Sequence, residues 1–231
     1  MKITWLGQAG LLFEREGLTL MIDPYLSNSV AKVNPKNDRR VPVDERFFEI
    51  TPDLLLFTHD HLDHYDPETA PRFFAKRDKT ITVLAPTTAF EKARAFGGDH
   101  NYVEMAPRCE WTANGMRITA VKAAHSDPYA LGYVLEDLLE GKTYYVTGDT
   151  LYNRDAFADL PGEIDAVFCP INGVGNNMNA ADAIRFCAKT GARRAVPLHF
   201  GMFDALDPHE LFLLENRVIP TLYEEIKLNL N

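Results

Sequence analysis

The sequence predicts an α/β (α+β) domain in which β-sheets are covered on the outside by helices. Short apolar runs at close spacing fill the first third of the chain, and strand-like runs then alternate with helical ones. This order is typical of sheets with helices packed against their outer faces. The 231 residues, 46% of them hydrophobic, are enough for a full core, and no repeat or linker divides them. We therefore expect one domain over residues 1–231.

The N-terminal third predicts a β-meander. Residues 3–6, 11–13 and 18–22 are short apolar or alternating runs, and Gly7, Gly10 and Gly17 separate them. Residues 53–58 (Asp-Leu-Leu-Leu-Phe-Thr) form a continuous apolar run. Such a run predicts a strand that is covered on both faces.

The rest of the chain predicts six more strands and four helices. The strands are expected at residues 81–84, 116–123, 132–135, 143–146, 166–168 and 194–198. Helical spacing occurs at residues 67–76, 87–95, 180–190 and 208–216. Asp66, Pro86 and Asp207 stand near three of the helix starts, and Gly191 follows the end of one helix.

Residues 27–46 form the one long segment without periodicity. Segments of this kind in compact domains are typically lids or binding loops. Arg39 and Arg40 lie within it, and two interpretations are open: the pair grips a substrate phosphate, or it belongs to a solvated basic turn. The solvated turn is favoured because exposed arginine pairs usually serve solubility.

Charge and hydropathy exclude several functional classes. The 24 Lys+Arg and 33 Asp+Glu give a formal charge of −9, and there is no basic block. Because nucleic acids and anionic membranes are bound through clustered cations, we expect neither as a partner. No apolar run approaches the roughly 18 residues of a membrane span, and no signal-peptide pattern is present, so a cytoplasmic location is expected. A homo-oligomer remains open, since residues 212–214 and 222–223 suit a core or an interface.

The most informative segment is the histidine-rich run that follows the apolar strand at residues 53–58. It contains His59, His61, Asp63 and His64 in the pattern HxHxDH. In an extended segment, residues two apart point the same way, so His59 and His61 can share a ligand. Imidazole and carboxylate groups suit zinc, iron or manganese. A solvated turn is the alternative, but this spacing after a buried strand favours metal binding.

Three further candidate ligands follow predicted strands downstream. They are His125, Asp149 and His199. Side chains at the ends of several strands can converge on one rim of the fold. The two remaining histidines fit other roles, His100 in a surface turn and His209 in the first turn of a helix.

With this ligand set the chain resembles the metallo-β-lactamase superfamily, whose HxHxDH signature is followed by His, Asp and His in this order. The resemblance implies a four-layer αββα sandwich with mixed sheets and helices outside. It also implies a metal at His59, His61 and His125, and another at Asp63, His64 and His199. Asp149 would lie between the two metals. A resemblance to true zinc β-lactamases would imply a Cys near the position of Asp149. No Cys lies there, which argues against that branch.

Further motifs resemble the L-ascorbate-6-phosphate lactonase-like branch of this superfamily. They are Trp-Leu-Gly-Gln-Ala-Gly at 5–10, Ile-Asp-Pro-Tyr at 22–25, Gly-Val-Gly-Asn-Asn-Met-Asn at 173–179 and Pro-Leu-His-Phe-Gly-Met-Phe at 197–203. Asp23 is expected to accept a hydrogen bond from a ligand imidazole. Asn176, Asn177 and Asn179 are expected to offer amide donors to a polar substrate. The duller explanation of each motif is a turn, a strand exit or a loop before a helix.

These observations predict a metal-dependent hydrolase acting on a small polar lactone or ester, which could carry a phosphate. One or two divalent ions, Zn²⁺ or Mn²⁺ with Fe²⁺ as a further option, would lower the pKa of bound water to about 7. Asp63 and Asp149 are the candidate catalytic residues that would position this water and carry its proton. A phosphodiesterase of the same fold is the nearest alternative. A metal-binding protein without catalytic activity is the alternative of another class.

Overall fold

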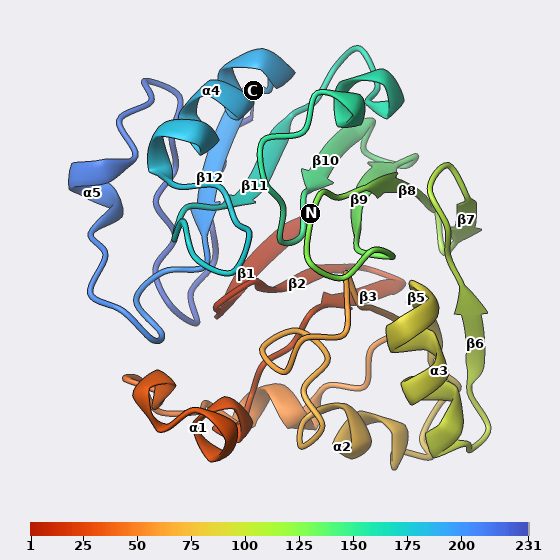
Figure 1. The fold of residues 1–231 in the computed structure, drawn as a ribbon. Helices are drawn as coiled ribbons and strands as arrows, with labels where there is room; N and C mark the ends of the chain where they lie inside the picture. Colours follow the sequence, from red (N-terminus) through yellow and green to blue (C-terminus); the bar gives the residue numbers. More distant parts are fainter. Residues whose placement is uncertain (231) are drawn as a thin grey trace.

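The computed structural model describes residues 1–230 and consists of two six-stranded sheets with helices outside them (Figure 1). The strand order is β1-β2-β3-β4-β5-β6 in the first sheet and β12-β11-β10-β9-β8-β7 in the second. The first sheet contains β1 (Lys2–Gly7), β2 (Gly10–Arg15), β3 (Leu18–Ile22), β4 (Leu54–Leu56), β5 (Thr82–Ala85) and β6 (Asn101–Glu104). The second contains β7 (Glu110–Ala113), β8 (Met116–Lys122), β9 (Leu131–Asp137), β10 (Lys142–Val146), β11 (Ala166–Pro170) and β12 (Arg194–Leu198).

The first sheet starts with the predicted meander. Strands β1, β2 and β3 pair antiparallel, and β3 to β6 are parallel. Alternate side chains along each strand enter different cores, as the period of two requires. In β4, Leu54 and Leu56 face the core between the sheets, whereas Leu55 packs with the outer helices. Both faces of this strand are therefore covered, as its apolar run predicts.

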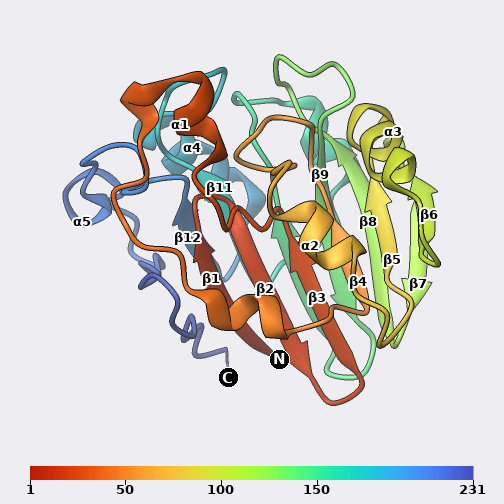
Figure 2. The same ribbon diagram turned by 90° about the horizontal axis from the view of Figure 1, so that it is seen from below.

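The helices are α1 (Ser29–Val33), α2 (Ala70–Phe74), α3 (Thr87–Phe96), α4 (Ala180–Thr190) and α5 (Pro208–Leu211). Helices α2 and α3 pack on the outer face of the first sheet, and α4 packs on that of the second. Figure 2 shows the first sheet lying over the second, with α2 against its near face. Phe73 of α2 and Ala89 of α3 are fully buried against the first sheet, and Phe186 of α4 is fully buried against the second. The four layers are those of a metallo-β-lactamase sandwich.

Two strands and two helix lengths differ from the sequence prediction. Strands β6 and β7 were not predicted, because they are edge strands of only four residues each whose side chains are all exposed or half-buried. Helix α2 begins only at Ala70, after a turn in which Asp66 accepts from the Glu68 N–H. Helix α5 is a single turn, because the following chain leaves it to bond the 192–195 segment through Asn216.

Residues 27–46 are more regular than predicted. They contain α1 and a 3₁₀ turn, η1 (Pro35–Asn37), and a second 3₁₀ turn, η2 (Glu45–Glu49), begins at their end. The segment is joined to the chain after β12 by the Arg40 N–H, which donates to the Met202 carbonyl at 3.0 Å. It therefore forms a fixed wall beside that chain. Within residues 1–230, no helix is long and apolar enough to cross a membrane.

Candidate metal centre

The candidate ligands come from loops at one edge of both sheets. The loop after β4 supplies His59, His61, Asp63 and His64. Strands β8 and β10 both pair antiparallel with β9, and β10, β11 and β12 are parallel to one another. Strands β8, β10 and β12 therefore run in the same direction, and their carboxyl ends meet at one edge of the second sheet. His125, Asp149 and His199 follow these three strands within three residues. All seven predicted ligands are thereby brought together.

The first cluster consists of His59, His61 and His125. One ring nitrogen from each lies within 4.8 Å of the others. His125 Nε2 is 3.2 Å from His61 Nδ1, and the His59 ring centroid is 4.5 Å from that of His61. His59 uses its Nδ1 toward the Thr58 hydroxyl, at 3.0 Å, so its Nε2 is free to face the cluster. Three imidazole nitrogens can therefore hold one ion.

The second cluster consists of Asp63, His64 and His199. Asp63 Oδ2 is 3.2 Å from His199 Nε2 and 4.0 Å from His64 Nε2. Asp149 joins it, since its Oδ2 lies 3.3 Å from each of the same two imidazole nitrogens. The other oxygen of Asp149 makes no hydrogen bond although it is buried. This carboxylate can therefore contact two groups at once.

Unpaired buried atoms show that these residues fit a divalent metal ion. His59 Nε2, His64 Nε2 and Asp149 Oδ1 are all buried and make no hydrogen bond. A buried polar atom without a partner costs about 1–3 kcal/mol, so native proteins rarely leave three together. Imidazole nitrogen and carboxylate oxygen are ordinary ligands of zinc, manganese and iron. Cations coordinated at the two clusters would satisfy these atoms.

The histidines of the site differ in the direction in which their pKa values are shifted. Burial lowers the pKa of His59 well below its usual value, and the nearby His64 lowers it further. Burial would also lower the pKa of His199, but the Asp149 and Asp63 carboxylates raise it to about 9. Burial would raise the pKa of Asp149, yet His199 and His64 hold it well below its usual value. Asp149 is therefore ionised, and His59 is neutral as a metal ligand must be.

Asp23 accepts a hydrogen bond from an imidazole of the second cluster, which is the contact expected for it from the sequence. Its Oδ2 accepts from His64 Nδ1 at 2.7 Å, and its Oδ1 accepts from the Thr58 N–H at 2.8 Å. The side chain is buried, and its backbone adopts a left-handed φ of 44°. Because Nδ1 donates to Asp23, the lone pair of His64 Nε2 faces the cluster.

Two contacts of the site were missed from the sequence. The Gln8 amide donates to Asp63 Oδ2 at 2.8 Å, and its backbone carbonyl accepts from the His199 N–H at 3.0 Å. Asn172 lies 2.9 Å from His199 Nδ1. Gln8 and His199 both adopt positive φ values, 50° and 61°, which are unusual for residues with a Cβ. Gln8 and His199 each lie in one of the motifs quoted from the sequence, but the residues that their side chains contact are more than 25 positions away along the chain.

The three predicted substrate amides have different surroundings. Asn177 is buried, lines the cleft beside the clusters and donates to Asp149 Oδ2 at 2.7 Å. Asn176 is exposed, and its backbone carbonyl lies 3.3 Å from His125 Nδ1. Asn179 caps α4 by accepting from the Asp182 N–H, and it does not line the cleft. The Asn179 side chain lies at the helix cap and outside the cleft, so the structure gives no support to the substrate role expected for it.

Arg39 does not grip a substrate phosphate. Its guanidinium donates to the carbonyls of Val41 and Tyr25, each at 2.9 Å, and to the hydroxyl of Tyr223 at 2.6 Å. Arg40 is exposed, and neither arginine lines the cleft. Arg39 is thus neither a phosphate ligand nor part of a solvated turn. It ties the 27–46 segment to the strand exit and to the C-terminal chain.

The remaining histidines lie outside the two clusters. His209 is exposed in the first turn of α5, as predicted. His100 is not in a free surface turn: its Nδ1 accepts from the Ile81 N–H, and its Nε2 lies 2.9 Å from the Phe74 carbonyl. It therefore joins α2 to the start of β5.

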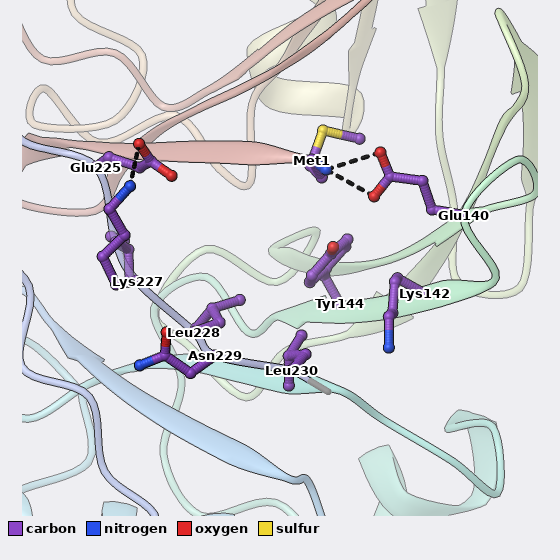
Figure 3. A pocket seen from close by; sticks show the side chains of 10 residues that line it. Met1, Glu140, Lys142, Tyr144, Glu225, Lys227, Leu228, Asn229 and Leu230 are labelled. Atoms are coloured by element: carbon purple, nitrogen blue, oxygen red, sulfur yellow. Dashed lines mark hydrogen bonds and ion pairs between the residues drawn. The ribbon is translucent and has the colours of Figure 1, made fainter.

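A second hollow, drawn in Figure 3, lies where the N-terminus meets the C-terminal segment. It contains an ion pair between the Met1 amino group and Glu140, and another between Lys227 and Glu225. Its lining includes no histidine or cysteine. The cleft beside the histidine clusters is a separate one and has a volume of about 280 Å³.

Comparisons with known proteins agree with this fold. The UPF0173 protein of Pyrococcus furiosus is 29% identical over 98% of this chain and 97% of its own length. A UPF0173 metal-dependent hydrolase of Carboxydothermus hydrogenoformans is 28% identical, over 89% of this chain and 87% of that protein. The metallo-β-lactamase fold protein YhfI of Bacillus subtilis superposes with a TM-score of 0.72 at 21% identity, covering 97% of this chain and 98% of that one.

The family model of the beta-lactamase superfamily domain matches residues 19–200. This range includes the β3 exit with Asp23, the HxHxDH loop and all three downstream ligand positions. The chain therefore belongs to the beta-lactamase superfamily.

Proposed function

We propose that this protein is a metal-dependent hydrolase that cleaves a small polar lactone or ester. The observation that carries the proposal is the set of buried atoms without a hydrogen bond, His59 Nε2, His64 Nε2 and Asp149 Oδ1, in two clusters whose other members line one cleft. The names of the UPF0173 relatives support the hydrolase class. The lactone preference rests on the sequence motifs that resemble the ascorbate-phosphate lactonase-like branch.

The two clusters supply the residues that would hold the ions. His59, His61 and His125 would hold one, and Asp63, His64 and His199 would hold the other. When bound, divalent ions acidify water to a pKa of about 7 and polarise a carbonyl oxygen. The ligands suit either zinc or manganese, since they include both imidazoles and carboxylates.

The protein's own side chains would orient the substrate and move the proton. Asp149 is ionised, and the Asn177 amide fixes its Oδ2 at 2.7 Å, so the carboxylate is held beside both clusters, where it could position the attacking water. Gln8 holds the Asp63 carboxylate in the same way from the other side. The amide of Asn177 also lines the cleft, where it can contact a polar substrate. No serine or cysteine nucleophile is needed.

The test compares metal content with turnover. We expect the wild-type protein to bind one or two divalent ions per chain, measured by elemental analysis, and to open lactones in a pH-stat assay. The double variant His59→Ala/His61→Ala should lose both properties. His209→Ala removes an exposed imidazole outside the clusters and is the matched control. Full turnover by metal-free protein would refute the proposal.

The same assay separates the alternatives. A phosphodiesterase would cleave bis-p-nitrophenyl phosphate faster than any lactone or carboxylic ester. A metal-binding protein without catalytic activity would be fully loaded with metal and inactive on all three substrate types. The absence of lysine and arginine from the cleft lining, within residues 1–230, favours the lactone or ester.

A further inference from the structure

The walls of the cleft are polar, and their one charged group outside the ligand clusters is acidic. The amides of Asn37 and Asn172 and the carboxylate of Asp204 line these walls. Val30, Val174 and Phe203 supply the apolar contacts. In the part of the chain that the structure describes, no lysine or arginine contributes to the lining. A substrate in this cleft therefore meets negative charge but no fixed positive side chain on the walls.

Asp204 is held in place by the backbone around it. Its Oδ1 accepts from the Gly201 N–H at 2.8 Å and from the Leu206 N–H at 3.0 Å. Both of these bonds use the same oxygen, so neither of them occupies Oδ2. The neighbouring ring of Phe203 lines the same cleft and packs edge-on against Tyr25, with 5.8 Å between ring centroids. A fixed carboxylate beside an aromatic ring is an arrangement that attracts an organic cation.

Three basic residues beside the wall residue Asn37 in the sequence do not line the cleft. Arg39 uses its guanidinium on protein carbonyls and on Tyr223. Lys36 and Arg40 flank the wall segment, but both are exposed and neither lines the cleft. Divalent ions would bring positive charge to the histidine clusters. The argument therefore concerns the part of the substrate that contacts the walls, and not its reacting carbonyl.

We propose that the cleft selects substrates whose group remote from the reacting carbonyl is neutral or cationic, and that Asp204 sets this preference. The inference rests on the proposed hydrolase function, whose site it describes. It argues against a substrate with a remote phosphate, which the sequence alone left open. An ammonium or a hydroxyl-rich group would suit Asp204, Phe203 and the wall amides, whereas a phosphate or sulfonate would be repelled.

The test uses three ligands of nearly equal shape and different charge. They are cyclopentanones that carry a trimethylammoniomethyl, neopentyl or sulfomethyl group at the carbon β to the carbonyl. These ketones keep the carbonyl but have no ester bond to break, so their dissociation constants from the metal-loaded protein, measured by NMR titration, do not depend on turnover. The γ-butyrolactones with the same groups then test hydrolysis separately.

We expect the trimethylammonium ligand to bind more tightly than the sulfonate. Asp204→Asn should reduce the ratio of their affinities by about tenfold, because it removes one partly exposed attraction and one repulsion. The asparagine oxygen can still accept from Gly201 and Leu206, so the turn should persist. The matched charge variant Lys36→Gln should leave the ratio unchanged.

Three results would overturn the inference: equal affinities for the three ketones, tighter binding of the sulfonate, or a ratio that survives Asp204→Asn. Loss of sulfonate binding in Lys36→Gln would also contradict it, because an anion site would then exist on the wall. Cation-selective binding without opening of any lactone would support the inference and refute the proposed function. Lactone hydrolysis without charge selection would do the reverse.

Discussion

Replacing Asp23 with asparagine should weaken metal binding although Asp23 is not itself among the predicted ligands. The buried carboxylate accepts from His64 Nδ1, from the Thr58 N–H and from the Thr58 hydroxyl. A carboxylate only accepts hydrogen bonds, whereas an amide accepts at one end and donates at the other. In either orientation, the asparagine amide would point an N–H at His64 Nδ1–H or at the Thr58 N–H. One donor must then lose its acceptor.

The size of the effect follows from these contacts. Loss of the acceptor that orients a ligand imidazole typically lowers metal affinity 10–100-fold, or about 1.4–2.7 kcal/mol. The unpaired buried donor should cost a further 1–3 kcal/mol, roughly, in the free energy of unfolding of the metal-free protein. Zinc affinity would be measured by competition with a chromophoric chelator, and stability by urea denaturation.

A matched control lies at the other end of β4. Asp53 accepts from the Thr19 N–H and pairs with Lys79, so it is also an aspartate that bonds a neighbouring strand. Asp53→Asn should lower stability and leave zinc affinity unchanged. The reasoning fails if Asp23→Asn binds zinc within twofold of the wild-type protein. It also fails if Asp53→Asn weakens zinc binding to the same extent.

Two further predictions concern stability. Gly148→Ala should destabilise the fold by about 1–3 kcal/mol and weaken metal binding, because a Cβ there would lie 2.7 Å from the Leu131 carbonyl oxygen. Gly141→Ala is the control, with a similar positive φ but no atom within 4 Å, and equal urea midpoints for the two variants would show that the contact is unimportant. Burial raises the pKa of Tyr25 and Tyr65 to about 12, so both phenols stay protonated in the folded state while the unfolded chain ionises near 10. Stability should therefore fall between pH 10 and 12, by up to about 1.4 kcal/mol per pH unit for each tyrosine. The variant Tyr25→Phe/Tyr65→Phe should show a shallower loss in urea titrations, and an identical slope would rule out these two groups.

The fold was predictable where local pattern and tertiary packing agree. The apolar run of β4 indicated a doubly covered strand, and the structure places Leu54 and Leu55 in different cores. Edge strands β6 and β7 have no such apolar run, because each has only four residues and none of them is buried. Their pairing depends on the sheets that they extend. Sequence periodicity alone does not contain that information.

The candidate site was predictable to the extent that its residues are close in sequence. His59, His61, Asp63 and His64 lie in one loop, and their spacing alone indicates a metal site. Gln8 could not be found in this way, because its partner Asp63 is 55 residues away. Arg39 showed the opposite difficulty, since a basic pair in a long loop gives no sign that its guanidinium is already bonded to carbonyl groups. Whether the clustered residues bind metal stays a prediction.

Each histidine cluster takes ligands from both sheets, since the loop after β4 belongs to the first sheet and His125 and His199 follow strands of the second. An ion at either cluster would act as a cross-link between two layers that are also joined by apolar packing and by hydrogen bonds such as that from the Leu131 N–H to the Thr58 carbonyl. Unfolding would then have to release the ion, and an ion present at 1,000 times its dissociation constant would add about 4 kcal/mol to stability. Metal supply would thus determine how long the folded protein survives, in addition to its capacity for catalysis.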